Sequence, residues 1–232
     1  MERVKRVRVH RVEAGNVESV DDTVVVERAV SIEVDGALQL TTICSPGELG
    51  EWAIGYLYGE GWIKSPDDVC AITHEGGSYS VRLREAGPIE LPGRVNSDLV
   101  LGTDRLLEAA SELTERAATF KETGGTHVAA IADRKEILTL AEDISRTCAL
   151  EKAIGEAVLT GVDFGRSFAL LSSRVPARMI AKLARCGIPI AAAVSAPTEA
   201  AIELAHGLRI CLCGFIRDER LNVYSHEWRV GL

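Results

Sequence analysis

Apolar residues in the first third of the chain gather in short runs separated by polar turns, a pattern typical of β-strands. Asp35-Gly36 links two of these runs and predicts a tight hairpin. A helix should follow, with Ser45 as its cap, Pro46 at its first position and Gly61 at its end. The predicted strands lie at residues 23–34, 37–43, 69–73 and 79–83.

The character of the chain changes after a stretch with several prolines and glycines at residues 88–93. Beyond it, segments of helical period alternate with short apolar runs, which favours helices layered on a largely parallel sheet. We therefore expect an α/β fold, with a smaller β-rich (α+β) domain at residues 1–95 and a layered α/β/α domain at residues 96–232. The predicted helices lie near residues 103–120, 146–159, 176–186 and 199–206, and the strands near 126–131, 137–140, 168–171, 188–194, 209–215 and 221–224.

Composition and charge are those of a globular protein. Of the 232 residues, 47% are hydrophobic and 26% are charged, and the formal net charge is −8. This negative charge disfavours nucleic acid and anionic membranes as partners. Residues 1–12 alternate basic residues with valine and have no apolar core, so no secretory signal is predicted. No apolar run approaches the ~20 residues that span a bilayer, and a cytoplasmic location is the default expectation.

The chain has six cysteines, none of them in a Cys-x-x-Cys pair. In the cytoplasm they should remain free thiols. Cys211 and Cys213 alternate within an apolar run, which predicts buried core thiols on one face of a strand. No histidine lies close enough in sequence to complete a metal site, so no metal bound by protein ligands is expected.

Two predicted strand ends carry residues suited to an anion. Ser172-Ser173-Arg174 and Ser195-Ala196-Pro197-Thr198 each follow a strand and precede a helix. Ligands of such sheets bind beyond the carboxyl ends of the strands, where hydroxyls and free backbone N–H groups favour phosphate. Arg174 could hold the anion bidentately. The alternative is that Ser195 and Thr198 are only helix caps.

Two further segments are candidates. Thr123-Gly124-Gly125-Thr126-His127 permits close backbone approach to a ligand, although a plain helix end is the alternative. His127 is either a base or a structural residue. Asp143 and Arg146 near a helix start are either functional or a cap with a surface ion pair. Cys148 in the same first turn is a candidate thiol with a depressed pKa.

In their order along the chain, these segments resemble the formate dehydrogenase accessory (FdhD-type) family. Residues 123–129 fit Thr-Gly-Gly-x-His-x-Ala, and residues 187–198 fit Gly-Ile-Pro-x-x-Ala-x-Val-Ser-Ala-Pro-Thr. Part of Arg-Glu-Asp-Val-Gly-Arg-His-Asn-Ala-x-Asp-Lys is also kept. The remaining matches are Glu142, Asp143, Arg146, Ala149, Lys152, Ser172, Arg174, Gly214 to Arg217 and Asn222-Val223-Tyr224.

The resemblance implies a larger domain with the fold of cytidine deaminases, a homodimer, and binding of the guanine dinucleotide form of a molybdenum or tungsten pterin cofactor. It also implies sulfur relay from a cysteine desulfurase to the metal, for delivery to formate dehydrogenase or a related enzyme. The residues that it assigns to cofactor binding are Thr123, Gly124, Gly125, His127, Asp143, Arg146, Ser172, Arg174, Ser195, Ala196, Pro197, Asn222 and Tyr224.

The chain departs from the family at the cysteine pair of the relay. The interval that should hold Cys-x-x-Cys, residues 94–104, contains no cysteine, and a hydroxyl cannot carry a persulfide. Three hypotheses remain: a cofactor-binding chaperone without the relay, a sulfurtransferase that uses another thiol such as Cys148, and a diverged nucleotide-binding protein or enzyme with a different ligand. A zinc deaminase is excluded, because His-x-Glu and Pro-Cys-x-x-Cys are absent.

Overall fold

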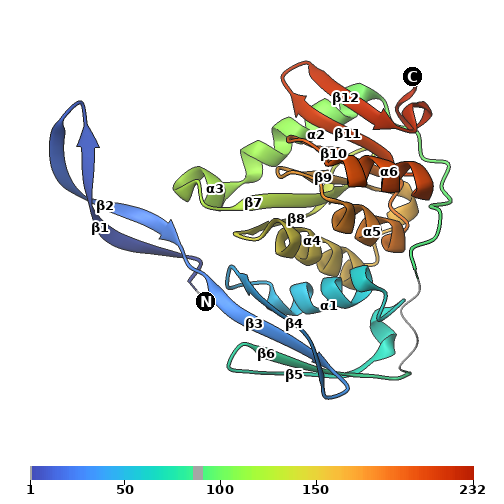
Figure 1. Cartoon of the computed structure of the whole chain (residues 1–232), viewed down its shortest axis with the longest axis horizontal. Coiled ribbons are helices and arrows are strands. Elements are labelled where there is room, and N and C mark those ends of the chain that lie inside the picture. The colour runs from blue at the N-terminus through green and yellow to red at the C-terminus, as the bar shows by residue number, and fades with distance from the viewer. Residues whose placement is uncertain (1, 86–90) are drawn as a thin grey trace.

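The computed structural model describes residues 2–85 and 91–232, so Pro88 of the predicted boundary lies outside the described residues. The strands form three sheets, and the largest has six strands in the order β12-β11-β10-β9-β7-β8 (Figure 1). The strands of this sheet are β7 (His127–Ala132), β8 (Ile137–Asp143), β9 (Phe168–Leu171), β10 (Ile190–Ala193), β11 (Cys211–Arg217) and β12 (Arg220–Ser225).

The six-stranded sheet is buried on both faces. Ala129 and Ile131 of β7 point toward one apolar core, while Val128 and Ala130 point toward the other. The first core is closed by three helices and the second mainly by one, as the layers in Figure 1 show. The helices are α4 (Arg146–Thr160), α5 (Ala177–Cys186) and α6 (Glu199–Leu208) on one face, and α2 (Thr103–Arg116) on the other.

The sheet is mixed, so the prediction of a largely parallel core is wrong. Among the described strands of this sheet, only the neighbours β9–β10 and β10–β11 pair in parallel. The pairs β7–β8 and β11–β12 are joined by short turns that force antiparallel pairing, and β7 is also antiparallel to β9. The α/β character and the helix layers are confirmed, whereas the likeness to cytidine deaminases stays a prediction.

A four-stranded sheet in the order β4-β3-β6-β5 packs against one helix, α1 (Leu49–Glu60). Its strands are β3 (Arg28–Val34), β4 (Ala37–Cys44), β5 (Val69–Glu75) and β6 (Ser78–Leu83). The other side of α1 lies on α4, which in turn packs on β7 and β8, so α1 and α4 both lie between the two sheets (Figure 1). The division at residue 95 into two domains stays a prediction.

Three local predictions are wrong. Residues 23–34 are two strands, because the chain leaves the ribbon formed by β1 (Val4–Glu13) and β2 (Asn16–Val25) before β3 begins. Ser45 does not cap α1, which begins at Leu49 after Glu48 in a left-handed conformation with φ 43°. The helix expected over residues 103–120 is divided at Ala117 into α2 and α3 (Ala118–Thr123).

Candidate functional site

The predicted strand ends meet at one edge of the six-stranded sheet. Strands β9 and β10 are parallel neighbours, so residues 172–174 and 195–198 leave the sheet side by side. The two segments are joined by backbone hydrogen bonds from Val175 N–H to the Ala196 carbonyl at 3.1 Å and from Thr198 N–H to the Val175 carbonyl at 3.0 Å. Thr198 also caps α6, so the prediction that it is a helix cap is correct. The strand end that contains it still lies at this edge of the sheet.

The glycine turn reaches the same edge because β7 runs antiparallel to β9. The Ser172 hydroxyl accepts a hydrogen bond from Val128 N–H at 2.8 Å, and Ser172 N–H donates to the Val128 carbonyl at 2.9 Å. Gly124 and Gly125 directly precede this pairing. Strand β8 ends beside it, with His127 opposite Asp143. The glycine segment at residues 123–127, the end of β8 at Asp143 and the segment at residues 172–174 are therefore brought together.

The C-terminal motif completes the edge. Asn222 of β12 pairs with Gly214 of β11, and the Asn222 amide donates to the Tyr224 hydroxyl at 3.3 Å. A methyl group on Gly214 would stand 2.9 Å from Pro197 and 3.2 Å from the Ser195 carbonyl oxygen. Only glycine permits this close approach of β11 to the β10 strand end.

The edge is electropositive around His127. Burial lowers the pKa of the His127 imidazole, Arg146 and Arg174 lower it further, and Asp143 opposes them. The lowered pKa favours the neutral form of the ring at neutral pH, so the positive charge at this edge comes from Arg146 and Arg174. This combination favours an anionic group in front of the strand ends.

A cavity of about 470 Å³ opens beside His127. Leu113 and Phe120 line it from α2 and α3, and Gly125 and Ser172 line it from the strand ends. The size and the mostly apolar lining suit a small ligand that is held by few polar groups.

Glu142 orders the cavity wall, which the sequence did not reveal. Its carboxylate accepts hydrogen bonds from the Thr119 and Phe120 N–H groups at 2.9 and 2.7 Å and from the Thr126 hydroxyl at 3.0 Å. These bonds hold the first turn of α3 against the glycine segment. Glu142 and Asp143 are neighbours on β8, so their side chains point to opposite faces of the sheet. Strand alternation was therefore the sequence signal that could have assigned different roles to Glu142 and Asp143.

Asp143 acts behind the site. Its carboxylate is fully buried and pairs with Lys152 at 2.7 Å, and it accepts hydrogen bonds from the N–H groups of Ser45 and Ser145 at 3.1 and 2.8 Å. Burial raises its pKa, although Lys152 opposes the shift. Both oxygens of Asp143 are used within the protein, so it positions the start of α4 and Arg146.

Cys148 is not an activated thiol. Its side chain is only 2% exposed, while its N–H donates to the Ser145 hydroxyl that caps α4 at 3.4 Å. The candidate depression of its pKa is not found: contact with the Cys44 thiol raises the pKa of Cys148, and burial raises it further. Position at a helix start does not lower a thiol pKa when the thiol is withdrawn from water.

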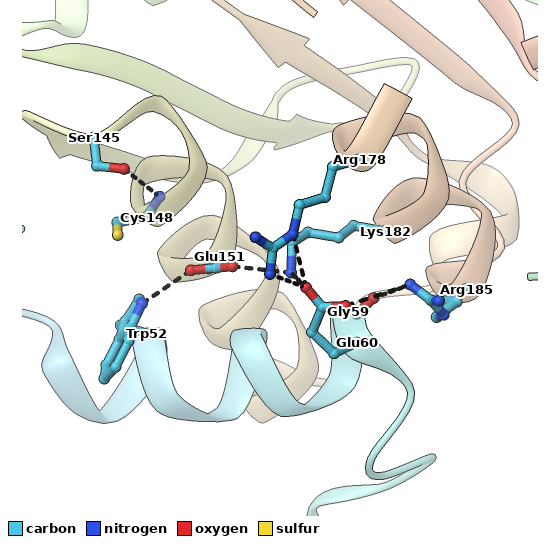
Figure 2. Close-up of polar contacts among 9 residues, drawn as sticks. All are labelled: Trp52, Gly59, Glu60, Ser145, Cys148, Glu151, Arg178, Lys182 and Arg185. Carbon is cyan, nitrogen blue, oxygen red and sulfur yellow. Dashed lines mark hydrogen bonds and ion pairs between the residues drawn. The ribbon is translucent and has the colours of Figure 1, made fainter. Parts of the chain in front are cut away.

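A buried ion cluster joins α1, α4 and α5 (Figure 2). Lys182 Nζ lies 2.9 Å from Glu151 Oε1 and 2.7 Å from Glu60 Oε1. Trp52 Nε1 donates to the second Glu151 oxygen at 2.9 Å, and Arg178 contacts Glu60 at 2.6 Å. The cluster fixes the helix that follows the β9 strand end.

Within the described parts of the chain, no group of three or more His, Cys, Asp or Glu side chains could hold a metal ion. In residues 2–85 and 91–232, no helix is long and apolar enough to cross a membrane.

Comparison with known proteins identifies the family. The model of the FdhD/NarQ family matches residues 25–96 and 88–231. The sulfur carrier protein FdhD of Methanothermobacter thermautotrophicus is 35% identical over 231 residues, which cover 91% of this chain and 92% of that protein. The sulfur carrier protein FdhD of Listeria innocua is 31% identical over 260 residues, which cover 99% of this chain and all of that protein.

The fold has a counterpart among solved structures. The crystal structure of a protein assigned as a formate dehydrogenase accessory protein from Desulfotalea psychrophila matches with a TM-score of 0.86 and 22% identity, and covers 99% of this chain and 100% of its own. At this identity the match shows the shared fold. The family match and the sequence relatives show that this chain belongs to the FdhD/NarQ family.

Proposed function

We propose that this chain is an accessory protein for formate dehydrogenase maturation that binds a molybdenum or tungsten pterin guanine dinucleotide at the clustered strand ends. The observation that carries the proposal is the meeting of five separate motifs at one electropositive edge beside the 470 Å³ cavity. The names of the relatives connect the family with sulfur carriage and with formate dehydrogenase.

The residues present fit a dinucleotide. Arg146 and Arg174 near His127 supply positive charge for the phosphates. The apolar cavity wall and the turn at Gly124 and Gly125 leave room for a flat ring. When bound, the cofactor would supply the metal centre of the client enzyme, and this chain would bind, orient and shield it.

The proposal includes a sulfur relay impaired by the missing cysteine pair. The interval 94–104 has no cysteine, and the chain there is held in place by the buried Arg229, which donates to the Ser97 and Leu99 carbonyls at 2.8 and 3.3 Å. Five of the six cysteines are buried, and the exposed one, Cys70, lies on β5 of the other sheet. No thiol therefore stands exposed at the strand ends.

The alternative of a sulfurtransferase that uses Cys148 meets a physical obstacle, because a buried thiol with a raised pKa is a poor nucleophile. A diverged protein with another nucleotide ligand is the second alternative, and nucleotide selectivity distinguishes it. A homodimer, a formate dehydrogenase client, a cysteine desulfurase partner and a cytoplasmic location complete the proposal.

Brief treatment of the native protein with iodoacetamide is expected to modify Cys70 and to leave Cys148 unmodified, because only the Cys70 thiol reaches solvent. Mass spectrometry of the digested protein measures each site. The Cys70→Ser variant should take up almost no label until it is denatured. Rapid modification of Cys148 in the folded protein would revive the sulfurtransferase alternative.

Titration with guanosine diphosphate and adenosine diphosphate tests the ligand by calorimetry. We expect the guanine nucleotide to bind more tightly, and Arg174→Ala to weaken binding by at least about tenfold through loss of a charge-assisted contact. Arg134→Ala is the matched control, since Arg134 is also exposed but lies in the turn at the far end of β7. Absence of binding by both nucleotides would remove support for the cofactor, and equal binding would favour a different nucleotide ligand.

A further inference from the structure

The β1–β2 ribbon is an arm that extends away from the rest of the molecule (Figure 1). Among the residues that the structure describes, its two strands of ten residues pair only with each other. At its base, Val26 N–H donates to the Arg3 carbonyl at 2.8 Å, Arg3 forms an ion pair with Glu48, and Val25 packs on Gly125. Beyond this base most side chains are exposed. A two-stranded ribbon without cover is marginally stable in water, so this length of arm suggests a partner.

One face of the arm carries an apolar stripe. Directly paired residues of antiparallel strands share a face, and here Val9 pairs with Val20. Val7 lies on the same face next to Val9, and Val24 lies on it beyond Asp22, which stands opposite Val7. Val24 is 37% exposed although the arm base is near it. Val7, Val9 and Val20 are half-buried, and with Val24 they form a valine stripe that is flanked on this face by Lys5 and Asp22.

The two strands of the arm have opposite charge. β1 carries Lys5, Arg6, Arg8 and Arg11 before a terminal Glu13, whereas β2 carries Glu18, Asp21 and Asp22. Of these charged residues, Lys5, Arg11, Glu13, Glu18 and Asp22 lie on the valine face. Arg11 stands opposite Glu18 on the valine face. A surface with a basic side and an acidic side matches neither a polyanion nor a uniformly basic partner. It matches the same surface of a second copy related by a two-fold axis, because the basic strand of one copy then lies on the acidic strand of the other.

We infer that the valine face of the arm is the surface on which a second copy of this chain packs, and this inference rests on the homodimer proposed above. With a two-fold axis between the ribbons and parallel to the strands, Val9 of each copy meets Val20 of the other. The same operation places Arg11 of each copy on Glu18 of the other. It also places Asp22 of each copy over Val7 of the other, with Lys5 of that other copy next along the strand on the same face. Burial of the valine stripe and two sets of opposite charges then stabilise both the arm and the dimer.

Sedimentation velocity over a range of concentrations tests the inference. The wild-type chain should be a dimer, and Val9→Asp with Val20→Asp should raise the dimer dissociation constant by at least about 30-fold, the effect of losing a central contact. The matched control is Val12→Asp with Val17→Asp, another directly paired couple, on the opposite face and 67% and 65% exposed. The control should remain dimeric. Thermal unfolding checks that the body of each variant is folded.

Reversing the charges of Arg11 and Glu18 in separate variants distinguishes a lost dimer contact from a misfolded arm. Arg11→Glu and Glu18→Arg should each weaken the homodimer, whereas an equimolar mixture of the two variants should form a heterodimer with both contacts restored. A monomeric wild type would overturn both the homodimer and the arm contact. A wild-type dimer that the Val9 and Val20 substitutions leave unweakened would overturn the arm contact alone, with another surface as the interface.

Discussion

Substitution of alanine for Gly55 is expected to destabilise the protein by about 3 kcal/mol or more. Gly55 of α1 faces Gly155 of α4 where the two helices cross. A methyl group on Gly55 would overlap the Glu151 carbonyl oxygen and stand 2.8 Å from the Gly155 nitrogen, both of them backbone atoms. The helices must move apart to admit it, which opens the apolar layers around Trp52 and Leu150.

Urea unfolding followed by circular dichroism measures this loss. Gly50→Ala is the matched control, because Gly50 lies in the same helix with open space where its side chain would stand. Alanine there should stabilise the protein by up to ~1 kcal/mol through its better helix propensity. If Gly55→Ala changed stability as little as Gly50→Ala does, the close contact of the helices would not exist in solution.

The architecture of the larger sheet could be predicted in outline because it depends on local period. The helices near residues 146–159, 176–186 and 199–206 lie within about two residues of α4, α5 and α6. Strand direction could not be predicted, since it depends on which strands become neighbours. The arm was not predicted, although its valines alternate as in a strand. A strand is usually recognised by one apolar, buried face, and most side chains of β1 and β2 are exposed.

The site was predicted through its strand ends, because parallel neighbours must end at the same edge. The sequence did not separate the roles of Glu142, Asp143 and Arg146, whose motif was interpreted as one unit. In the structure Glu142 supports the cavity wall, Asp143 is withdrawn to Lys152, and Arg146 stays near His127. The partners that Glu142 and Asp143 find on the two faces of β8 come from segments distant in sequence, so the sequence near β8 does not indicate them.

The ion cluster behind the site could not be predicted. Trp52, Glu151 and Lys182 come from three helices and are about 30 to 130 positions apart along the chain. On a helix, Glu and Lys normally indicate the solvated face. Here they are fully buried, because α1 packs against both α4 and α5 and the three side chains meet between these helices.

Lys182→Met is therefore expected to cost about 3–5 kcal/mol of unfolding free energy at neutral pH. The substitution conserves the bulk of the side chain but removes the cation between Glu151 and Glu60. Glu151 is 1% exposed. Without Lys182 it loses its ion pair and keeps the hydrogen bond from Trp52 Nε1. An uncompensated buried carboxylate is strongly destabilising.

Arg178→Met is the matched control, since Arg178 contacts the same Glu60 oxygen at 2.6 Å but its side chain is 57% exposed. Solvent screens this pair, so its loss should cost less than about 1 kcal/mol. Equal losses in the two variants would contradict the importance of burial. The double variant Lys182→Met, Glu151→Gln should recover most of the stability, because neither side chain then carries a buried charge.

The loss in Lys182→Met should also depend on pH in a defined direction. Burial already raises the pKa of Glu151 in the wild type, with Lys182 as the main opposing influence, so removal of Lys182 raises the pKa further. A carboxyl whose folded-state pKa is raised favours folding when protonated, and this contribution is lost as the pH rises through that pKa. The difference in unfolding free energy between wild type and variant should therefore shrink as the pH falls from neutral toward the acid range.

In the double variant, which has no carboxyl at position 151, this part of the pH dependence should disappear. A difference in Lys182→Met that stayed constant with pH would show that lost packing, and not the unpaired charge of Glu151, is the cause of the instability.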